Sequence, residues 1–266
     1  MPTRISRLAA VSLLAFLTVS ITGKAENAPQ PFTPGEMLTY DVTWSVFRAG
    51  EVTATLRSTG EGSNDAYKVT TTARTQGFVW LLFDVNNEFR SFFSPQTLCS
   101  QRIVKKINEG RRHKDTLIVF DNIRKLALLD ERDLSQANAP AKHAENEIPA
   151  CVEDVVTAFY YLRRQHLEVS HTIEVPVNDG SKTQRVVVEV QAREKIQTPM
   201  GTFDAFRVEP KVFHGLLKRK GRMLIWFSAD NQQLPLRIKA MISLGSITGT
   251  LRSVSHPPPD ASPASP

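Results

Sequence analysis

Polar and apolar residues alternate along most of this chain. From Leu38 to Phe47, the even positions carry apolar or aromatic side chains and the odd positions are mostly polar. Successive side chains of a β-strand point to opposite faces, so this period predicts a strand with one buried and one solvated face. The same period returns in segments as far as Val254, roughly ten to twelve strands in all by this pattern.

Short turn signals separate these segments. Glycine and asparagine tolerate the positive φ angles that tight turns require, and proline favours turn positions. The predicted turns are Ala49-Gly50, Asn108-Glu109-Gly110, Asn178-Asp179-Gly180 and Pro199-Met200-Gly201. Residues 131–149 are polar and Ala-rich, and we predict that they form a long surface loop.

Residues 151–165 depart from the alternation and are predicted to form the main helix. Apolar side chains recur there at three- and four-residue spacing, which places them on one stripe of a helix. The stripe consists of Val152, Val155, Val156, Phe159 and Tyr160. We expect the helix to bury Val155, Val156 and Phe159.

Charged residues at the two ends of this segment have the signs that the helix dipole favours. Glu153 and Asp154 fall in the predicted first turn, and Arg163 and Arg164 fall in the last. We therefore interpret the two acidic residues as dipole stabilisation rather than as an acid–base pair.

Many short strands and one helix are typical of a large antiparallel sheet that curls on itself. We predict a mainly β fold, a half-barrel or barrel with the helix packed against the sheet, in a single domain over residues 35–254.

Residues 1–25 have the features of a cleavable signal peptide. Arg4 and Arg7 precede an apolar run from Leu8 to Ile21, and small residues stand at Gly23 and Ala25. We predict export to the periplasm with cleavage before Glu26, and no transmembrane span in the cleaved chain. Residues 26–34 are predicted to be a flexible leader, and residues 255–266 a disordered Pro-rich tail.

Cleavage would remove three positive charges and no negative ones, which lowers the formal net charge from +6 to +3. This modest charge gives no reason to expect a nucleic-acid partner. Cys99 and Cys151 are the only cysteines. An exported chain with one pair of cysteines favours a disulfide, with two buried thiols as the alternative.

The usual catalytic motifs are absent from the sequence. The six histidines form no His-x-x-x-His pattern, and neither a Gly-x-Ser-x-Gly elbow nor a phosphate-binding glycine loop occurs. We therefore expect no catalytic residues, no metal and no cofactor. A basic segment, Lys218–Arg222, follows apolar residues and is interpreted as an exposed hairpin loop, with contact to an anionic membrane as the alternative.

Aromatic residues on the apolar faces are the candidates for ligand binding. They are Tyr40, Trp44, Phe159, Tyr160 and Trp226. The alternative is that these side chains fill the core, as aromatic residues on apolar faces usually do.

Several short motifs, taken in order, resemble the bacterial exported family of unknown function DUF3108. They are Gly35-Glu36-x-Leu38-x-Tyr40, Ala49-Gly50-Glu51, Asp154-x-x-Thr157-x-x-Tyr160-Tyr161-x-Arg163, Gly201-Thr202-Phe203-x-Ala205, and Asp230 with Pro235. Thr157 stands where serine is the more common residue of the family. The resemblance implies a soluble periplasmic β protein of a Gram-negative bacterium, without an established reaction. In outline, the predicted fold is also similar to the half-barrel carriers of the Lol system. For Arg163 of the motif, the alternative is a structural role as the buried anchor of an ion pair with an acidic residue of the sheet.

Together these features predict a monomeric, non-enzymatic periplasmic protein that binds a lipid or other hydrophobic envelope molecule in a groove under the helix. The alternatives are a structural or assembly factor for an envelope partner protein, and a hydrolase whose motif is not recognisable.

Overall fold

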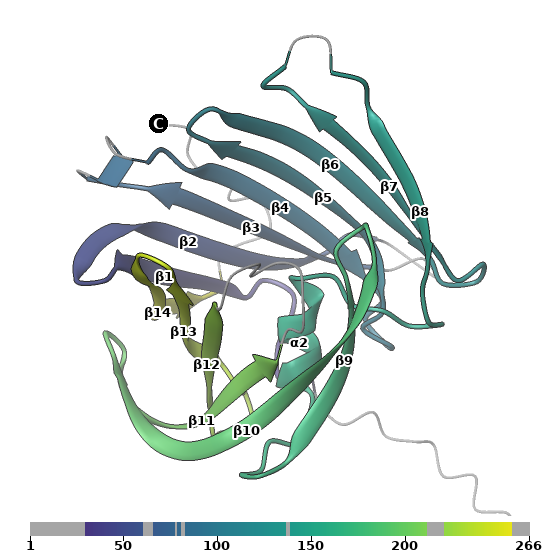
Figure 1. The fold of residues 1–266 in the computed structure, drawn as a ribbon. Helices are drawn as coiled ribbons and strands as arrows, with labels where there is room; N and C mark the ends of the chain where they lie inside the picture. The colour runs from purple at the N-terminus through teal and green to yellow at the C-terminus, as the bar shows by residue number, and fades with distance from the viewer. Residues whose placement is uncertain are drawn as a thin grey trace, which may run out of the picture. The chain divides into compact units, whose positions relative to one another are not determined.

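The computed structural model describes residues 30–60, 66–77, 79–80, 83–136, 139–211 and 221–256. The predicted signal peptide, the greater part of the predicted basic loop and residues 257–266 of the predicted tail lie outside these residues. The fold described below belongs to the unit Pro31–Pro266. Its strands form one 14-stranded sheet in which every pairing is antiparallel (Figure 1).

The chain as far as Arg163 supplies eight strands and the helix α2. They are β1 (Met37–Trp44), β2 (Phe47–Ser58), β3 (Tyr67–Thr75), β4 (Asn86–Phe93), β5 (Ser100–Glu109), β6 (Arg112–Asp121), β7 (Leu126–Asp133), β8 (Lys142–Glu147) and α2 (Thr157–Arg163). The chain beyond Arg163 supplies β9 (Thr172–Asn178), β10 (Thr183–Thr198), β11 (Gly201–Lys211), β12 (Arg222–Ser228), β13 (Pro235–Ile242) and β14 (Gly245–Ser255).

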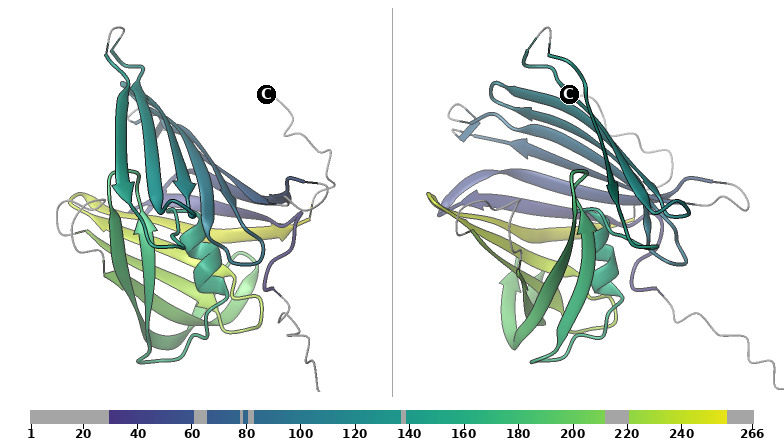
Figure 2. Two further views of the ribbon diagram at one scale, coloured as in Figure 1. Left: turned by 90° about the vertical axis from the view of Figure 1, so that its right-hand side faces the viewer. Right: turned by 45° about the vertical axis from the view of Figure 1, so that its right-hand side comes forward.

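The sheet is a meander that opens in the middle of the sequence. Strands β8 and β9 form its two edges, whereas β1 and β14 pair with each other in its interior. The connection from β8 to β9 therefore crosses the opening, and it carries α2. The two halves of the sheet lie on either side of this helix (Figure 2). The predicted antiparallel sheet with one packed helix is confirmed, in the open form.

Side chains bridge the two edges at one end without completing the ladder. The Asn178 amide donates to Oδ1 of Asn146 at 2.6 Å, and the Asn146 amide donates to the carbonyl of Gly180 at 3.0 Å. The Thr183 hydroxyl donates to the carbonyl of Glu147 at 3.2 Å. These bonds hold β8 beside the β9–β10 turn.

Three of the four predicted turns are confirmed. Gly110, Gly180 and Gly201 adopt φ angles of 55°, 98° and 127°, which non-glycine residues rarely take. The turn predicted at Ala49-Gly50 is wrong, because both residues lie inside β2 and the chain reverses at Ser45 instead. Gly50 serves close packing of strands: a Cβ there would lie 2.1 Å from the carbonyl oxygen of Arg74.

The long loop predicted over residues 131–149 is also wrong. Strand β7 continues to Asp133, and residues 142–147 form β8 at the edge of the sheet. The side chains of β8 are mostly exposed and charged. Charged side chains are common on edge strands, where they discourage pairing with other chains. The polar composition of this segment therefore indicated its exposure but concealed its conformation.

Helix α2 is shorter than the predicted helix of residues 151–165 and spans seven residues. The backbone before it bonds to two distant strands instead. The Val152 carbonyl accepts from Ser100 N–H at 2.9 Å, and Glu153 N–H donates to the Pro176 carbonyl at 2.8 Å. These bonds occupy backbone groups that a helix would need, so Glu153 and Asp154 are not in its first turn. The Asp154 carboxylate nevertheless accepts from the N–H groups of Val156 and Thr157 at the start of the helix, whereas no such contact is found for Glu153 within the described residues.

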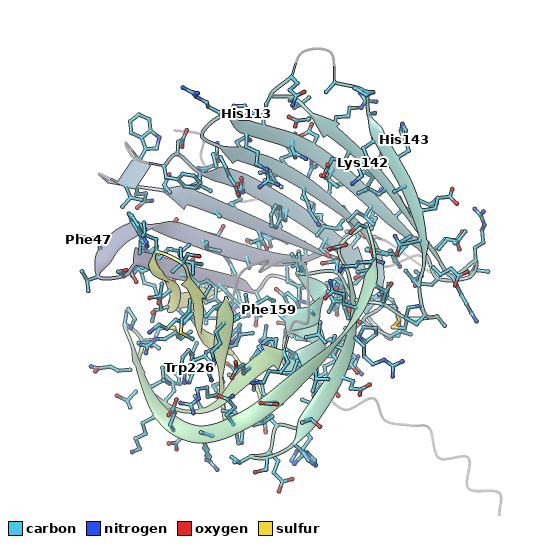
Figure 3. The ribbon with its side chains drawn as sticks, viewed as in Figure 1. Phe47, His113, Lys142, His143, Phe159 and Trp226 are labelled. Carbon is cyan, nitrogen blue, oxygen red and sulfur yellow. A yellow bond between two sulfur atoms is a disulfide. The ribbon has the colours of Figure 1, made fainter. Side chains whose placement is uncertain are left out.

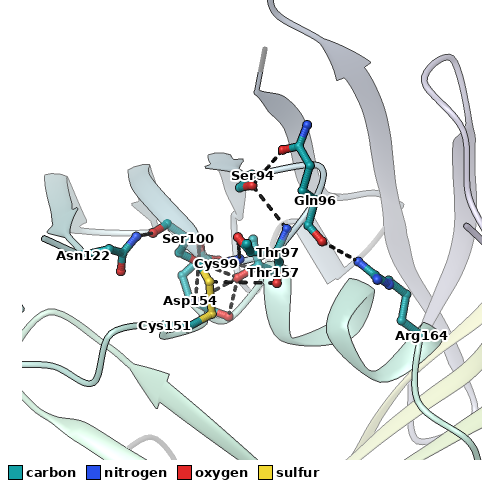
Figure 4. Close-up of a disulfide and its surroundings, with 10 residues drawn as sticks. All are labelled: Ser94, Gln96, Thr97, Cys99, Ser100, Asn122, Cys151, Asp154, Thr157 and Arg164. Carbon is teal, nitrogen blue, oxygen red and sulfur yellow. Dashed lines mark hydrogen bonds between the residues drawn. A yellow bond between two sulfur atoms is a disulfide. The ribbon is translucent and has the colours of Figure 1, made fainter. Parts of the chain in front are cut away.

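The predicted disulfide is present and fixes the start of this crossing segment. Cys99 precedes β5, and Cys151 lies three residues before Asp154, with the two Cα atoms 5.0 Å apart (Figure 4). The bridge spans a sequence separation of 52 residues. Closing a loop of this size stabilises the folded state by roughly 4 kcal/mol in the chain-entropy model.

Asp154 is a buried anchor between the sheet and the helix. Its carboxylate accepts hydrogen bonds from the hydroxyls of Ser91 in β4 and Ser100 in β5. It also accepts from the backbone N–H groups of Val156 and Thr157 at 2.7 and 3.1 Å. Burial raises the pKa of Asp154, and these four donors act against that shift.

Glu153 is buried next to Asp154 but is poorly satisfied. Only 1% of the residue is exposed, and Oε2 has no hydrogen-bond partner among the described residues. Burial raises the pKa of Glu153 to about 8. The side chain is therefore mainly protonated at neutral pH.

Arg163 anchors the other end of the helix through a buried ion pair, the structural alternative given above, with a partner that lies just before β1. Its guanidinium binds both carboxylate oxygens of Glu36, at 2.6 and 2.9 Å, and the two side chains are 1% and 5% exposed. It also donates to the carbonyls of Pro31 and Gln232. One side chain thus joins α2 to the residue before β1 and to the β12–β13 turn.

We predict that breaking the Arg163–Glu36 pair destabilises the protein severely. Replacing Arg163 with Met should lower the free energy of unfolding by about 3–5 kcal/mol, because it leaves a buried carboxylate without its partner. The exposed pair Arg185–Glu174 is the matched control, and Arg185→Met should cost less than about 1 kcal/mol. Urea denaturation measures both, and equal losses in the two variants would contradict the prediction.

We predict that Glu153 makes stability fall with rising pH. Its folded pKa lies above its value in the unfolded chain, so the folded state holds a proton that the unfolded state releases. This contribution is complete below about pH 4.3, the usual Glu value, and is lost as the pH rises through about 8. The variant Glu153→Gln lacks this titration. Its free energy of unfolding minus that of the wild type should therefore be larger at pH 9 than at pH 5, by on the order of 2 kcal/mol. Urea denaturation of the wild type and of this variant at both pH values measures the effect. The assignment is refuted if the difference between their free energies of unfolding is the same at pH 5 and at pH 9.

Candidate functional site

The alternation of the strands gives the sheet an apolar inner face, which we define as the face carrying Leu38, Tyr40 and Val42. Helix α2 and the residues before it lie over this face. Val155, Val156 and Phe159 were all expected to be buried, but they are only half-buried. The reason is that all three border unfilled space between the helix and the sheet.

The central cavity has a volume of about 350 Å³. Strands β1 to β4, β13 and β14 form its walls together with the helix segment, and these walls are almost entirely apolar. The principal lining residues are Leu38, Tyr40, Val52, Ala54, Phe89, Val155, Phe159, Tyr160, Ile238 and Ala240.

Two further cavities adjoin the central one. The first, of about 360 Å³, lies between the helix and strands β9, β10 and β12, and shares Val155 and Phe159 as walls. The second, of about 700 Å³, extends toward the β1–β2 and β13–β14 turns and shares Val42, Val52 and Ile247. We call these three adjoining spaces the apolar groove, because they share lining residues. Each volume falls in the range of about 300–1,000 Å³ that is usual for small-molecule sites.

Four of the five aromatic residues singled out from the sequence lie along this groove. Tyr40, Phe159 and Tyr160 line the central cavity. Trp44 lines the cavity of about 700 Å³ near the β1–β2 turn. Phe159 projects from the helix between the two halves of the sheet (Figure 3). Their position makes contact with a ligand feasible, and it also lets them pack against the protein itself.

Trp226 is not brought to the groove. Its strand neighbour Ile225 lines the second cavity, so Trp226 points to the opposite face of β12. There its indole N–H donates to Glu194 at 2.6 Å, and the same carboxylate accepts from Arg207. Trp226 therefore lines none of the three cavities and belongs to a buried core cluster that also holds Leu38 and Tyr40.

The central cavity has few polar lining residues. Tyr160 is buried, and its hydroxyl has no hydrogen-bond partner within the described residues. Burial raises the pKa of both Tyr40 and Tyr160, so both phenols stay neutral donors at physiological pH. Arg163 reaches the same cavity but is committed to Glu36.

Lys105 is the candidate that the sequence does not single out. It lies in β5 on the same phase as the buried Ile103, so it points to the inner face. A lysine on the apolar phase of a strand was the available signal, since such a position normally carries an apolar side chain.

The chemistry that this arrangement offers is apolar contact with a small number of hydrogen-bond donors. The described lining of the three cavities includes no serine, cysteine or histidine. No group of three or more potential metal ligands is found within the described residues. No helix in the described part of the chain combines the length and apolar character that crossing a bilayer requires.

Solved structures are similar to this chain at low sequence identity, and the first of them shares its fold. A β-barrel-like protein of family DUF1849 from Brucella abortus is 10% identical, with 84% of this chain and 98% of that chain covered and a TM-score of 0.56. A Bacteroides fragilis protein with a YmcC-like fold is 12% identical, with 85% and 97% covered and a TM-score of 0.37. A hypothetical protein from Chlamydia trachomatis is 10% identical, with 88% and 93% covered and a TM-score of 0.38.

None of the curated proteins matches the chain. The family described as "Protein of unknown function (DUF3108)" matches residues 39–252, which include all but the outermost residues of the sheet. The chain therefore belongs to the DUF3108 family.

Proposed function

We propose that this protein is a non-enzymatic carrier that binds a lipid or another hydrophobic envelope molecule in the apolar groove. One observation supports this proposal above the others. Val155, Val156 and Phe159 project from the crossing segment toward the sheet, yet they remain half-buried beside adjoining cavities. A helix whose role was only to fill the core would bury these side chains against the strands.

The energetics of the groove favour an extended apolar ligand. Removing apolar surface from water yields about 25 cal/mol per Å², or about 0.8 kcal/mol for each buried methylene group. An alkyl chain lying along the adjoining cavities would cover the helix residues and the strand residues opposite them at the same time.

The proposal places the protein in the periplasm of a Gram-negative cell. The signal-like residues 1–25 and the disulfide between Cys99 and Cys151 support this assignment, since stable disulfides are typical of oxidising compartments. In that compartment, a carrier with a sheltered groove would keep a hydrophobic molecule out of water between membranes.

A role in assembling an envelope partner is the second candidate, and the open edges β8 and β9 are the feature that favours it. An exposed strand can add a strand of another protein. The charged side chains of β8, however, are of the kind that protects an edge from pairing. The carrier proposal is therefore preferred.

We predict that the purified protein binds the neutral fluorescent probe N-phenyl-1-naphthylamine saturably, and that Phe159→Asp weakens this binding at least about tenfold. A carboxylate in the apolar groove would have to be desolvated when the probe binds. Ile123→Asp is the control, because Ile123 is 94% exposed in a turn and contributes to none of the three cavities.

A second variant separates loss of binding from loss of folding. Ala240→Phe places a larger apolar side chain in the central cavity, so it should block the probe while the thermal unfolding midpoint is kept. Absence of saturable binding by the wild type, together with an empty lipid extract from protein purified without detergent, would refute the carrier.

A further inference from the structure

Lys105 extends a row of residues that crosses the inner face of the sheet. Ala54, Thr71 and Phe89 pair directly across β2, β3 and β4, and all three line the central cavity. The next residue in the row is Lys105 of β5, which pairs with Phe89. Directly paired residues of antiparallel strands share a face, so the lysine stands beside the wall of the groove.

The charge of Lys105 is not compensated by a partner within the described residues. The side chain is half-buried, and it makes neither an ion pair nor a hydrogen bond there. Two other cations that face the space between helix and sheet are paired: Lys114 lies 2.8 Å from Glu131, and Arg163 binds Glu36. Burial lowers the pKa of Lys105, which is the cost of holding an unpaired ammonium group among apolar side chains.

Three carboxyl groups face Lys105 from other elements, and each is committed elsewhere. Asp154 accepts from two hydroxyls and two backbone N–H groups. Asp179, in the β9–β10 turn, accepts from Ser181 and from backbone N–H groups of its own turn. Glu131 binds Lys114. Their fields favour the charged form of Lys105 without supplying a direct partner.

Asp179 is a second link between Lys105 and the groove. It lines the second cavity, while Phe89 lines the central one. Lys105 pairs with Phe89 across β4 and β5, and it interacts electrostatically with Asp179. Lys105 itself lines none of the three cavities, and its place beside the central one follows from its pairing with Phe89.

We propose that Lys105 binds the anionic headgroup of an amphiphile whose apolar chain occupies the groove. The headgroup is a carboxylate or a phosphate, and the inference rests on the proposed carrier function. The arrangement divides the ligand into two parts: apolar walls take the chain, and one unpaired cation at their margin takes the charge. A neutral hydrocarbon would leave that cation without a partner.

The test compares a fluorescent fatty acid with its neutral ester. The wild-type protein should bind cis-parinaric acid about 10- to 100-fold more tightly than methyl parinarate, the range expected for one hydrogen bond to a charged group. Lys105→Met should remove this preference by weakening the acid alone, whereas Lys105→Arg should keep it. The matched control is Lys106→Met, because Lys106 is exposed and points to the outer face of the same strand.

Competition then identifies the headgroup. Displacement of the acid probe by lysophosphatidic acid more strongly than by oleate, again dependent on Lys105, would assign a phosphate. The reverse order would assign a carboxylate. Thermal unfolding of Lys105→Met, which removes an unpaired half-buried charge, should show a midpoint no lower than that of the wild type.

The outcomes separate the two proposals. If acid and ester both bind, and Lys105→Met changes neither, the headgroup assignment is overturned while the carrier stands. If neither probe binds the wild type, the carrier itself fails and this inference fails with it.

Discussion

The buried ion pair between Arg163 and Glu36 determines where the helix lies on the sheet. A guanidinium that is almost fully buried needs its partner in place, and the same group also holds two backbone carbonyls from separate segments. Asp154 and the disulfide fix the other end of the crossing segment to β4 and β5. The helix segment is therefore held at one end by the Arg163–Glu36 pair and at the other by Asp154. The apolar side chains between these anchors approach the sheet without filling the space, and the groove is what remains.

Period-two alternation was sufficient to predict the sheet, its antiparallel character and most of its turns. It failed where contacts distant in sequence decide the conformation. Residues 152–154 have helical spacing, but their backbone bonds to β5 and β9. The edge strand β8 has no apolar face to reveal it. Gly50 resembles a turn residue, and only the backbone of β3 beside it explains the glycine.

The candidate site was partly accessible from the sequence for similar reasons. Tyr40, Phe159 and Tyr160 belong to elements with a clear apolar phase, so their convergence on one face could be anticipated. Trp226 could not be placed, because β12 is apolar on both phases and alternation does not tell its faces apart. Lys105 needed the pairing of β4 with β5 to bring it next to Phe89. No pattern of residues in the sequence indicates that the sheet stays open or that cavities lie under the helix.

The pairing of β1 with β14 has a consequence for how the chain acquires its fold. The hydrogen bond from Thr43 to the Thr248 carbonyl joins residues 205 positions apart. Until β14 has been synthesised, the inner strand β1 has one unsatisfied edge, and that edge lacks the charged guard that β8 possesses. Folds dominated by such distant pairings mature slowly. The first strands of the nascent chain therefore form an incomplete sheet that is prone to pair with other chains, and this edge is covered only when β14 pairs with β1.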